Sequence, residues 1–287
     1  MLTFKTGLTC LRYIRLIGFS RKRLNNQKSF ATRDQEVEAV IASTFRRPQF
    51  NVNPVETEGV FLRAGVGIDG DCHASPISPR QVLLAATGSY YQLGLAPNSL
   101  RENILIRVDR LSLSSGSLLL VGPDAALRIT FECEPCGRLN RIRDGLSRDI
   151  KGKRGYLARV VRSGVVRPGD EVKVIKSVFP SFPDDWRDRV LNIVRMIPSN
   201  HIISYARLAE LAGVPTSFCR SFPRLLRSHK NIPWQRVRSA NQLIQGESGR
   251  RSLKVRQLTS KREWLGNVIF DDEVQFMSRT FPSERAS

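Results

Sequence analysis

Uninterrupted apolar stretches and acidic side chains are both scarce in this sequence of 287 residues. No stretch approaches the roughly 18 consecutive apolar residues that a membrane-spanning helix needs, so no transmembrane helix and no membrane partner are expected. Lys and Arg outnumber Asp and Glu by 46 to 26, which gives a formal net charge of +20. An excess of this size predicts an anionic partner, with nucleic acid ahead of an acidic surface or an acidic small ligand.

Cysteine is also in short supply. Five cysteines, at 10, 72, 133, 136 and 219, do not form a disulfide framework in a chain of this length, and no secretory signal is evident. We therefore expect free thiols in a reducing compartment. The hydrophobic content of 41% is ordinary for a soluble protein and is sufficient for two domains, each with its own core.

The basic residues are concentrated in two regions. Residues 1–33 contain eight Lys or Arg and no acid, residues 34–176 contain twenty and sixteen, and residues 187–262 contain sixteen and three. The first region mixes its basic residues with Leu, Phe, Ile and hydroxyl side chains, which is typical of a mitochondrial transit peptide. The alternative is a disordered basic tail or a nuclear address, which leaves a nuclear or cytoplasmic location open.

Short apolar or alternating runs, separated by Gly-Pro, Pro-Gly and Ser-Ser-Gly, dominate residues 34–176. Several strands at this spacing predict a β-barrel or sandwich with few helices. The expected strands are Glu38–Ser43, Gln81–Leu84, Asn103–Val108, Ser117–Val121, Ala126–Phe131, Leu157–Arg162 and Glu171–Ile175.

The pattern changes to helical periodicity after residue 185. Apolar spacing predicts one helix over 186–196 and another over 205–212, the second stopped by Gly213. A basic segment, 216–229, comes next, although Pro223 does not fit the interior of a helix. Helix, turn and basic helix predict a helix-turn-helix.

These patterns give an α+β multidomain chain, a β-barrel followed by a small mostly α domain. The expected segments are a basic presequence or disordered tail at 1–33, the β-rich domain at 34–176, a linker with helix-capping acids at 177–185, the helical domain at 186–270 and a tail at 271–287.

Three runs in the helical region have a recognisable spacing. They are Val190-Leu-x-Ile-Val-x-x-Ile-Pro198, Ile203-Ser-Tyr205-Ala-x-Leu-Ala209-x-Leu-Ala-Gly213-x-Pro215 and Ile232-Pro-Trp-Gln-Arg-Val237. Together they resemble the DNA-binding domain of the O6-alkylguanine-DNA alkyltransferases. The resemblance implies a winged-helix-like domain with double-stranded DNA, alkylated or not, as its partner.

The sequence departs from that family at the catalytic position. Alkyltransferases carry a reactive cysteine in Pro-Cys-His-Arg-Val, whereas Trp234 and Gln235 stand here. An indole cannot accept an alkyl group and Gln cannot act as a base, so alkyl transfer at this position is excluded. Cys219 is not a substitute, because it lies beside Arg220 on the recognition segment rather than in the base pocket.

Trp at this position resembles the alkyltransferase-like proteins, which bind alkylated guanine without repairing it and pass it to nucleotide excision repair. The resemblance implies that Tyr205 presses on the target phosphate, Arg220 replaces the flipped base in the stack and Trp234 lines the pocket. The alternatives are a core aromatic at 234, a solvated charge at 220 and a packing residue at 205.

Further basic residues are candidates for DNA phosphate contacts. The family has small residues after the arginine finger, whereas Phe222 and Pro223 stand here, which argues against tight lesion recognition but leaves general DNA affinity. The candidates are Arg224, Arg227, Lys230, Arg236 and Arg238.

The β-rich segment contains a second ordered set of motifs. They are Gly67-Ile-Asp-Gly-Asp71, Arg80-Gln81, Leu100-Arg-Glu-Asn-Ile104, Cys133-Glu-Pro-Cys136, Gly155-Tyr-Leu-Ala-Arg159 and Gly164-Val-Val-Arg-Pro-Gly-Asp170. Their order resembles a MOSC domain, as found in the C-terminal part of molybdenum cofactor sulfurases. The resemblance implies binding of a molybdenum cofactor or molybdenum ion, and also pyridoxal phosphate as a ligand of the family.

Cys136 is the principal chemical candidate in this segment. If a helix begins there, its N-terminus and Arg138 or Arg141 would favour the thiolate. The resemblance implies that Cys136 carries sulfur or approaches the cofactor, with Arg80, Arg101 and Asn103 holding the phosphate or the pterin.

Other interpretations of Cys136 stay open. It could be a buried structural cysteine, one of four zinc ligands with Cys133, Cys72 and His73, or half of a redox pair with Cys133. We expect no metal site of the zinc type, because no second paired cysteine motif is present.

Two functions follow from the sequence. One is a DNA lesion sensor without catalysis in its C-terminal domain. The other is a MOSC-type enzyme or sulfur carrier for which the basic domain is only a nucleic-acid anchor.

Overall fold

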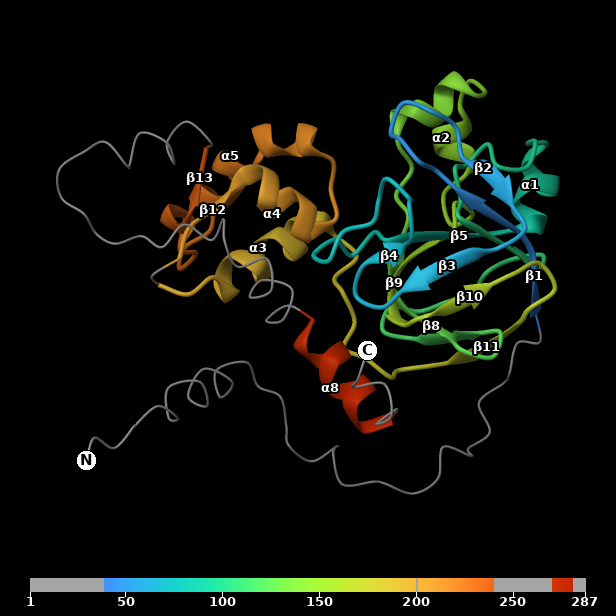
Figure 1. The fold of residues 1–287 in the computed structure, drawn as a ribbon. Helices are drawn as coiled ribbons and strands as arrows, with labels where there is room; N and C mark the ends of the chain where they lie inside the picture. The colour runs from blue at the N-terminus through green and yellow to red at the C-terminus, as the bar shows by residue number, and fades with distance from the viewer. Residues whose placement is uncertain (1–38, 200, 240–269, 281–287) are drawn as a thin grey trace, which may run out of the picture. The chain divides into compact units, whose positions relative to one another are not determined.

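The computed structural model describes residues 39–199, 201–239 and 270–280 (Figure 1). The predicted presequence at 1–33 lies outside these ranges. Within them, no helix is both long and apolar enough to cross a bilayer.

Seven strands close into a barrel in the order β11-β7-β8-β9-β5-β6-β1, and β1 pairs back onto β11. An additional short strand, β2 (Val55–Thr57), pairs with β1 outside this ring. Only β5 and β6 run parallel among the barrel neighbours. The seven are β1 (Ala39–Arg46), β5 (Val82–Ala86), β6 (Ile104–Arg107), β7 (Leu118–Val121), β8 (Ala125–Glu132), β9 (Tyr156–Arg162) and β11 (Glu171–Ile175).

The seven barrel strands are the seven that the sequence predicts, with bounds that differ by up to three residues. Aliphatic residues from all of them, such as Ile41, Leu84, Ile106 and Val160, fill one core and are fully buried. The β-branched and aliphatic content of these runs explains why they pair as strands.

Within the barrel domain, the elements that the sequence misses are short. A three-stranded sheet has the order β10-β3-β4, formed by Gly164–Val166, Val60–Arg63 and Gly67–Ile68. The missed helices are α1 (Thr87–Leu93), the 3-10 helix η3 (Gly137–Arg141) and α2 (Leu146–Asp149).

The helical domain follows the sequence prediction closely. Helix α3 (Trp186–Met196) begins at Asp185, whose carboxylate accepts a hydrogen bond from the Arg187 N–H at 2.8 Å. Helix α4 (Tyr205–Ala212) ends at Gly213, which has a left-handed backbone with φ of 65°.

The basic third segment divides into two helices. They are the 3-10 helix η4 (Thr216–Arg220) and α5 (Phe222–Ser228), joined at Ser221. Pro223 lies in the first turn of α5, where its missing N–H has no partner to lose, so the proline starts a helix rather than breaking one.

A short 3-10 helix and a parallel strand pair complete the domain. The 3-10 helix η5 (Trp234–Arg236) precedes β13 (Val237–Arg238), which pairs with β12 (Ile203–Ser204). A winged-helix form stays a prediction, since residues 240–269 lie outside the described ranges.

The end of α4 packs against the barrel. The Gly213 carbonyl accepts a hydrogen bond from Arg80 Nη1 at 3.0 Å, and Glu210 Oε1 accepts one from the Ser75 hydroxyl at 2.6 Å. Ile77 from the barrel side is fully buried among the aliphatic residues of the helices. The loop at 75–80 is therefore shared between the two domains.

Arg189 of α3 is the second link. Its guanidinium lies 3.8 Å from the ring centroid of Phe131 at the end of β8 and pairs with Glu134 at 2.7 Å. It also donates to the Ala212 carbonyl at 3.0 Å. Because Arg189 is only 2% exposed, these contacts replace the water that it loses on burial.

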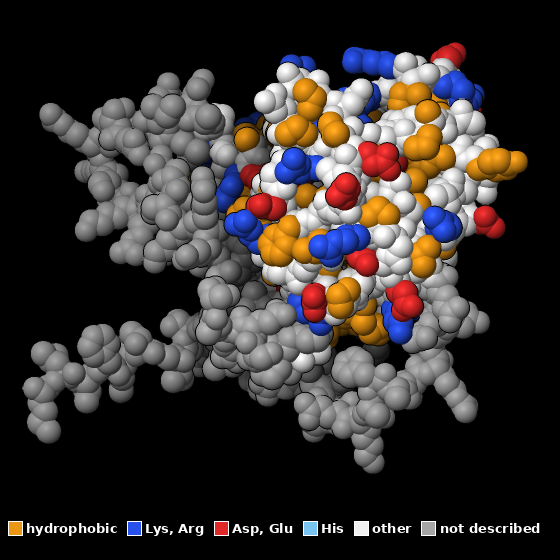
Figure 2. Space-filling model, turned by 45° about the vertical axis from the view of Figure 1, so that its right-hand side comes forward, with side chains coloured by type: hydrophobic (Ala, Val, Ile, Leu, Met, Phe, Trp, Pro, Cys, Tyr) orange, Lys and Arg blue, Asp and Glu red, His pale blue; other side chains and the backbone are white. Residues whose placement is uncertain are grey.

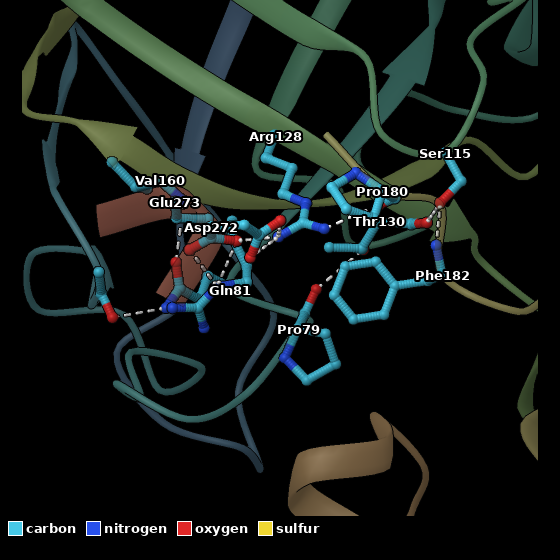
Figure 3. A network of polar contacts seen from close by, with 12 residues as sticks. Pro79, Gln81, Ser115, Arg128, Thr130, Val160, Pro180, Phe182, Asp272 and Glu273 are labelled. Atoms are coloured by element: carbon cyan, nitrogen blue, oxygen red, sulfur yellow. Dashed lines mark hydrogen bonds and ion pairs between the residues drawn. The ribbon is translucent and has the colours of Figure 1, made fainter. Parts of the chain in front are cut away.

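Residues 271–280 are not a tail. They form α8 (Asp271–Thr280), whose acidic first turn meets two buried guanidiniums of the barrel. Figure 3 shows Asp272 and Glu273 beside one of them, Arg128. Glu273 pairs with Arg128 of β8 at 3.0 Å and with Arg159 of β9 at 2.9 Å. The sequence gives no hint of this docking, because it depends on two arginines more than a hundred residues away.

Candidate functional site

Cys136 lies in the connection between β8 and η3. It is exposed and is the residue that precedes the first turn of η3, as the sequence predicts. Its carbonyl accepts the Leu139 N–H at 3.0 Å. Cys136 is thus not the buried structural cysteine that was the alternative interpretation.

Guanidinium groups gather around this thiol. Burial lowers the pKa of Arg101 to about 10, and the positive charges of Arg47 and Arg138 act in the same direction, whereas Cys72 and Cys136 oppose it. Burial likewise lowers the pKa of Arg138, with further contributions from Arg47, Arg154 and Arg141. Several cations therefore lie within electrostatic range of one another and of Cys136.

No carboxylate neutralises this cluster within ion-pair distance among the described residues. Arg154 is 9% exposed and donates through Nε to the sulfur of Cys133 at 3.3 Å, but its Nη1 is buried without a hydrogen-bond partner. The Nε of Arg101 is buried and unpartnered in the same way. Buried unpaired donors on cations are costly, and an anionic ligand would satisfy them.

Of the predicted ligand-holding residues, only Arg101 reaches this cluster with a free donor. Asn103 is 4% exposed; its oxygen accepts the Leu83 N–H at 3.0 Å and its amide donates to Asp71 at 3.0 Å. Arg80 holds the Gly213 carbonyl and the sulfur of Cys133. Both side chains are thus engaged in protein contacts.

The sequence reasoning missed Arg47, Arg138 and Arg154 as site residues. Arg47 directly follows β1, Arg138 lies on η3 and Arg154 precedes β9, so only the folding of the barrel brings these three residues together. Of the three, Arg138 has a signal in the sequence, because it lies two residues after Cys136, where its charge favours the thiolate.

A second group lies on the loop after β4. Asp71 accepts hydrogen bonds from the Arg47 N–H at 2.8 Å and from Asn103, and its other oxygen is 3.0 Å from His73 Nδ1. Burial raises the pKa of Asp71, but the hydrogen bonds from His73 and Arg47 outweigh it, and the net pKa lies below its usual value.

The four-ligand zinc interpretation finds no support in the described ranges. The one group there that could share an ion is Asp71, Cys72 and His73, without Cys133 or Cys136. Burial and the charge of Asp71 raise the pKa of Cys72, so its thiol form is favoured. The four described cysteines are free thiols, as expected.

In the helical domain, the candidate residues lie on neighbouring elements. Tyr205 opens α4 and is half-buried, with its ring centroid 6.3 Å from that of Phe222. Arg220 ends η4 and is exposed. Packing thus contributes to the position of Tyr205, while Arg220 stands at the surface just before α5.

Trp234 is half-buried on η5 and packs against the core of the helices. The guanidinium of Arg227 on α5 lies 5.3 Å from its ring centroid, at cation–π distance. Arg236 donates through one N–H to the Ile197 carbonyl at the end of α3, and its role in DNA binding stays a prediction. Arg224 and Arg227 remain exposed.

Cys219 is no replacement for the missing nucleophile. It is half-buried on η4, and burial raises the pKa of its thiol. A raised pKa disfavours the thiolate that alkyl transfer needs.

The barrel is a MOSC domain: the family model of that description matches residues 71–173. The helical part matches the model described as 6-O-methylguanine DNA methyltransferase, DNA binding domain, over residues 185–265. The chain is therefore a fusion of a MOSC domain with an alkyltransferase-type DNA-binding domain. The curated proteins contain no match to it.

Three solved structures are similar to this chain. The YuaD protein from Bacillus subtilis is 21% identical, with 49% of this chain and 97% of that chain covered and a TM-score of 0.42. YiiM from Escherichia coli is 16% identical over 71% and 98%, with a TM-score of 0.39. YiiM from Geobacillus stearothermophilus is 12% identical over 73% and 98%, with a TM-score of 0.38.

Proposed function

We propose that the C-terminal domain binds double-stranded DNA as an alkyltransferase-like lesion sensor and performs no alkyl transfer. The observation that carries this proposal is Trp234 at the position of the nucleophile, on η5, which follows helices α4 and α5. The exposed side chains of Arg220, Arg224 and Arg227 lie on η4 and α5, the elements that would face the DNA. They supply phosphate contacts that weaken as salt rises.

Trp234 and Arg227 are the residues that would receive a flipped base. A base that leaves the stack is held by aromatic or apolar walls. The Trp234 ring is half-buried, and Arg227 lies over it at 5.3 Å. An arriving base would take the place of the Arg227 guanidinium or stack beside it, which frees a cation for the DNA backbone. Nucleotide excision repair proteins are the partners that would follow such a sensor.

We propose further that the MOSC domain holds an anionic cofactor of the molybdenum cofactor class beside Cys136. The fit rests on the unneutralised guanidiniums and on the buried, unpartnered Nη1 of Arg154. Arg101, Arg138 and Arg154 would hold its phosphate, and Cys136 would approach its metal or carry sulfur. Such a cofactor supplies oxygen-atom transfer chemistry, whereas the chain supplies binding and orientation.

The second candidate function makes the MOSC domain the active part and the helical domain only an anchor on nucleic acid. The exposed thiol of Cys136 in a cationic surrounding favours it, because that is the environment of a reactive cysteine. The two functions can coexist in one chain, and they separate by mutation.

The test compares binding to duplexes with and without one O6-methylguanine, by gel shift. We expect wild type to prefer the lesion duplex, Trp234→Ala to lose the preference while keeping plain-duplex binding, and Trp234→Phe to keep part of it. Cys136→Ala is the matched control and should change neither. Equal binding of both duplexes by wild type would leave only nonspecific DNA attachment and favour the second candidate.

A further inference from the structure

The net positive charge of the MOSC domain comes from one segment. Residues 136–154 contain seven Lys or Arg and two acids, whereas the rest of 34–176 contains thirteen and fourteen. The barrel outside this segment therefore carries almost no net charge. Figure 2 shows a face of the domain on which acidic and basic side chains are interspersed.

The segment begins at Cys136 and comprises η3, α2 and their connections. Arg141, Arg148 and Lys151 are exposed there, and none has a carboxylate within ion-pair distance among the described residues. Arg143 is the one basic member that pairs, with Asp149 at 2.9 Å. On an ordinary surface of mixed charge, most basic side chains would pair with a carboxylate as Arg143 does, whereas, within the described ranges, most of the basic side chains in this segment do not.

Exposed apolar side chains accompany the charge. Phe50 is 66% exposed and Ile142 is 40% exposed. The Phe50 ring contacts His73 edge-on at 5.3 Å, and the Arg47 guanidinium lies 5.6 Å from its centroid. Arg47 is also one of the charges that act on Arg101 and Arg138, so Phe50 lies on the Arg47 side of the cationic cluster near Cys136.

We propose that this surface, residues 136–154 together with Phe50, binds a single-stranded nucleic acid. A single small anion needs only the guanidiniums at Cys136, whereas Arg141, Arg148 and Lys151 add exposed cations in the segment that follows, which fits a chain of phosphates. An exposed aromatic ring beside a basic track is the arrangement on which unpaired bases stack. A duplex keeps its bases stacked inside and would leave Phe50 unused.

The surface and the helix-turn-helix share no residues, so the protein would have two nucleic-acid sites with different preferences. The proposal deepens the proposed function of the MOSC domain: the substrate presented to Cys136 is a base within a strand. Binding itself does not depend on a cofactor or on lesion recognition, and it can therefore fail or succeed independently of them.

The experiment measures binding of the full chain to a labelled single-stranded 12-mer of thymidine and to a plain duplex, by fluorescence anisotropy over a salt series. The test variant is Arg141→Glu, Arg148→Glu, Lys151→Glu. The matched control is Arg107→Glu, Arg167→Glu, Lys173→Glu, at exposed barrel positions with the same charge change. A third variant, Arg224→Ala with Arg227→Ala, weakens the helix-turn-helix.

We expect the test variant to lose at least about tenfold in affinity for the single strand, and its salt slope to fall by about 2, since each lost phosphate contact removes about 0.7. Duplex binding should change less than threefold. Phe50→Ala should lower the affinity for the single strand about fivefold or more, while Phe50→Tyr should keep the affinity of wild type. Arg224→Ala with Arg227→Ala should lower the affinity for the duplex and leave the affinity for the single strand unchanged.

Equal losses in the test and control triples would show a general charge effect and overturn the proposal. So would single-strand binding that disappears only with Arg224→Ala and Arg227→Ala. If the duplex is not bound by wild type but the single strand is, the lesion-sensor function fails and this proposal stands.

Discussion

Replacing Gly213 with Ala separates the strain of a helix end from the contact between the two domains. Gly213 and Gly94 both end a helix with nearly the same left-handed backbone, at φ of 65° and 61°. A Cβ on Gly94 meets nothing within 4 Å, whereas one on Gly213 lies 2.7 Å from Phe131 Cζ and 2.8 Å from Pro79 Cγ. Gly94→Ala therefore measures the backbone term alone, about 1 kcal/mol.

Gly213→Ala adds the clash. Phe131 is 2% exposed and is held against the Arg189 guanidinium, so its ring cannot move away freely. Overpacking of this kind costs about 1–3 kcal/mol, which brings the total loss to about 2–4 kcal/mol. Urea unfolding followed by tryptophan fluorescence is the assay, because all three tryptophans lie between residues 186 and 264. Equal losses for the two variants would refute the contact between α4 and the barrel.

Three further predictions concern the barrel. Glu273→Gln leaves the buried Arg159 without a carboxylate and Arg128 with only the pair to Asp272, and it should cost about 3–5 kcal/mol in urea unfolding. Asp272→Asn, at a side chain that is 31% exposed, should cost less than about 1 kcal/mol. A loss below about 1 kcal/mol for Glu273→Gln would contradict the docking of α8. Among the described cysteines, exposed Cys136 should alkylate first and Cys133, 1% exposed, last, as read by peptide mass mapping; the opposite order would rule out the site as described. The pKa of Asp71 is lowered in the folded protein, so ionised Asp71 stabilises the fold above the ordinary Asp pKa of about 3.9. This stabilisation is lost as the pH falls through the folded-state pKa, and Asp71→Asn should therefore make the free energy of unfolding depend less on pH below about pH 4. A pH dependence as steep as that of wild type would argue against the lowered pKa.

The sequence predicts the long, regular elements well. The seven barrel strands and helices α3 and α4 have clear periodicity and clear ends, at Asp185 and Gly213. Strands β3, β4 and β10 have two to four residues each, too few for a pattern to be visible. Helix α8 is missed for another reason: its stability comes from a distant pair of arginines, and no local signal reports such a contact.

The same distinction applies to the site. Cys136 was identified because the motif and the turn after β8 are local features. Arg47 and Arg154 come from loops far apart in the chain, and only closure of the barrel brings them near the thiol. Asn103 was predicted as a ligand residue, but its amide is consumed by Leu83 and Asp71. Residue type therefore predicts capacity for binding, while the fold decides which groups are free.

The most direct test is the mass of both components in an isolated complex of this protein with a duplex that contains O6-methylguanine. We expect the protein at its unmodified mass and the guanine still methylated, because Trp234 binds where a nucleophile would react. A methyl group on the protein, with unmodified guanine in the DNA, would contradict the account.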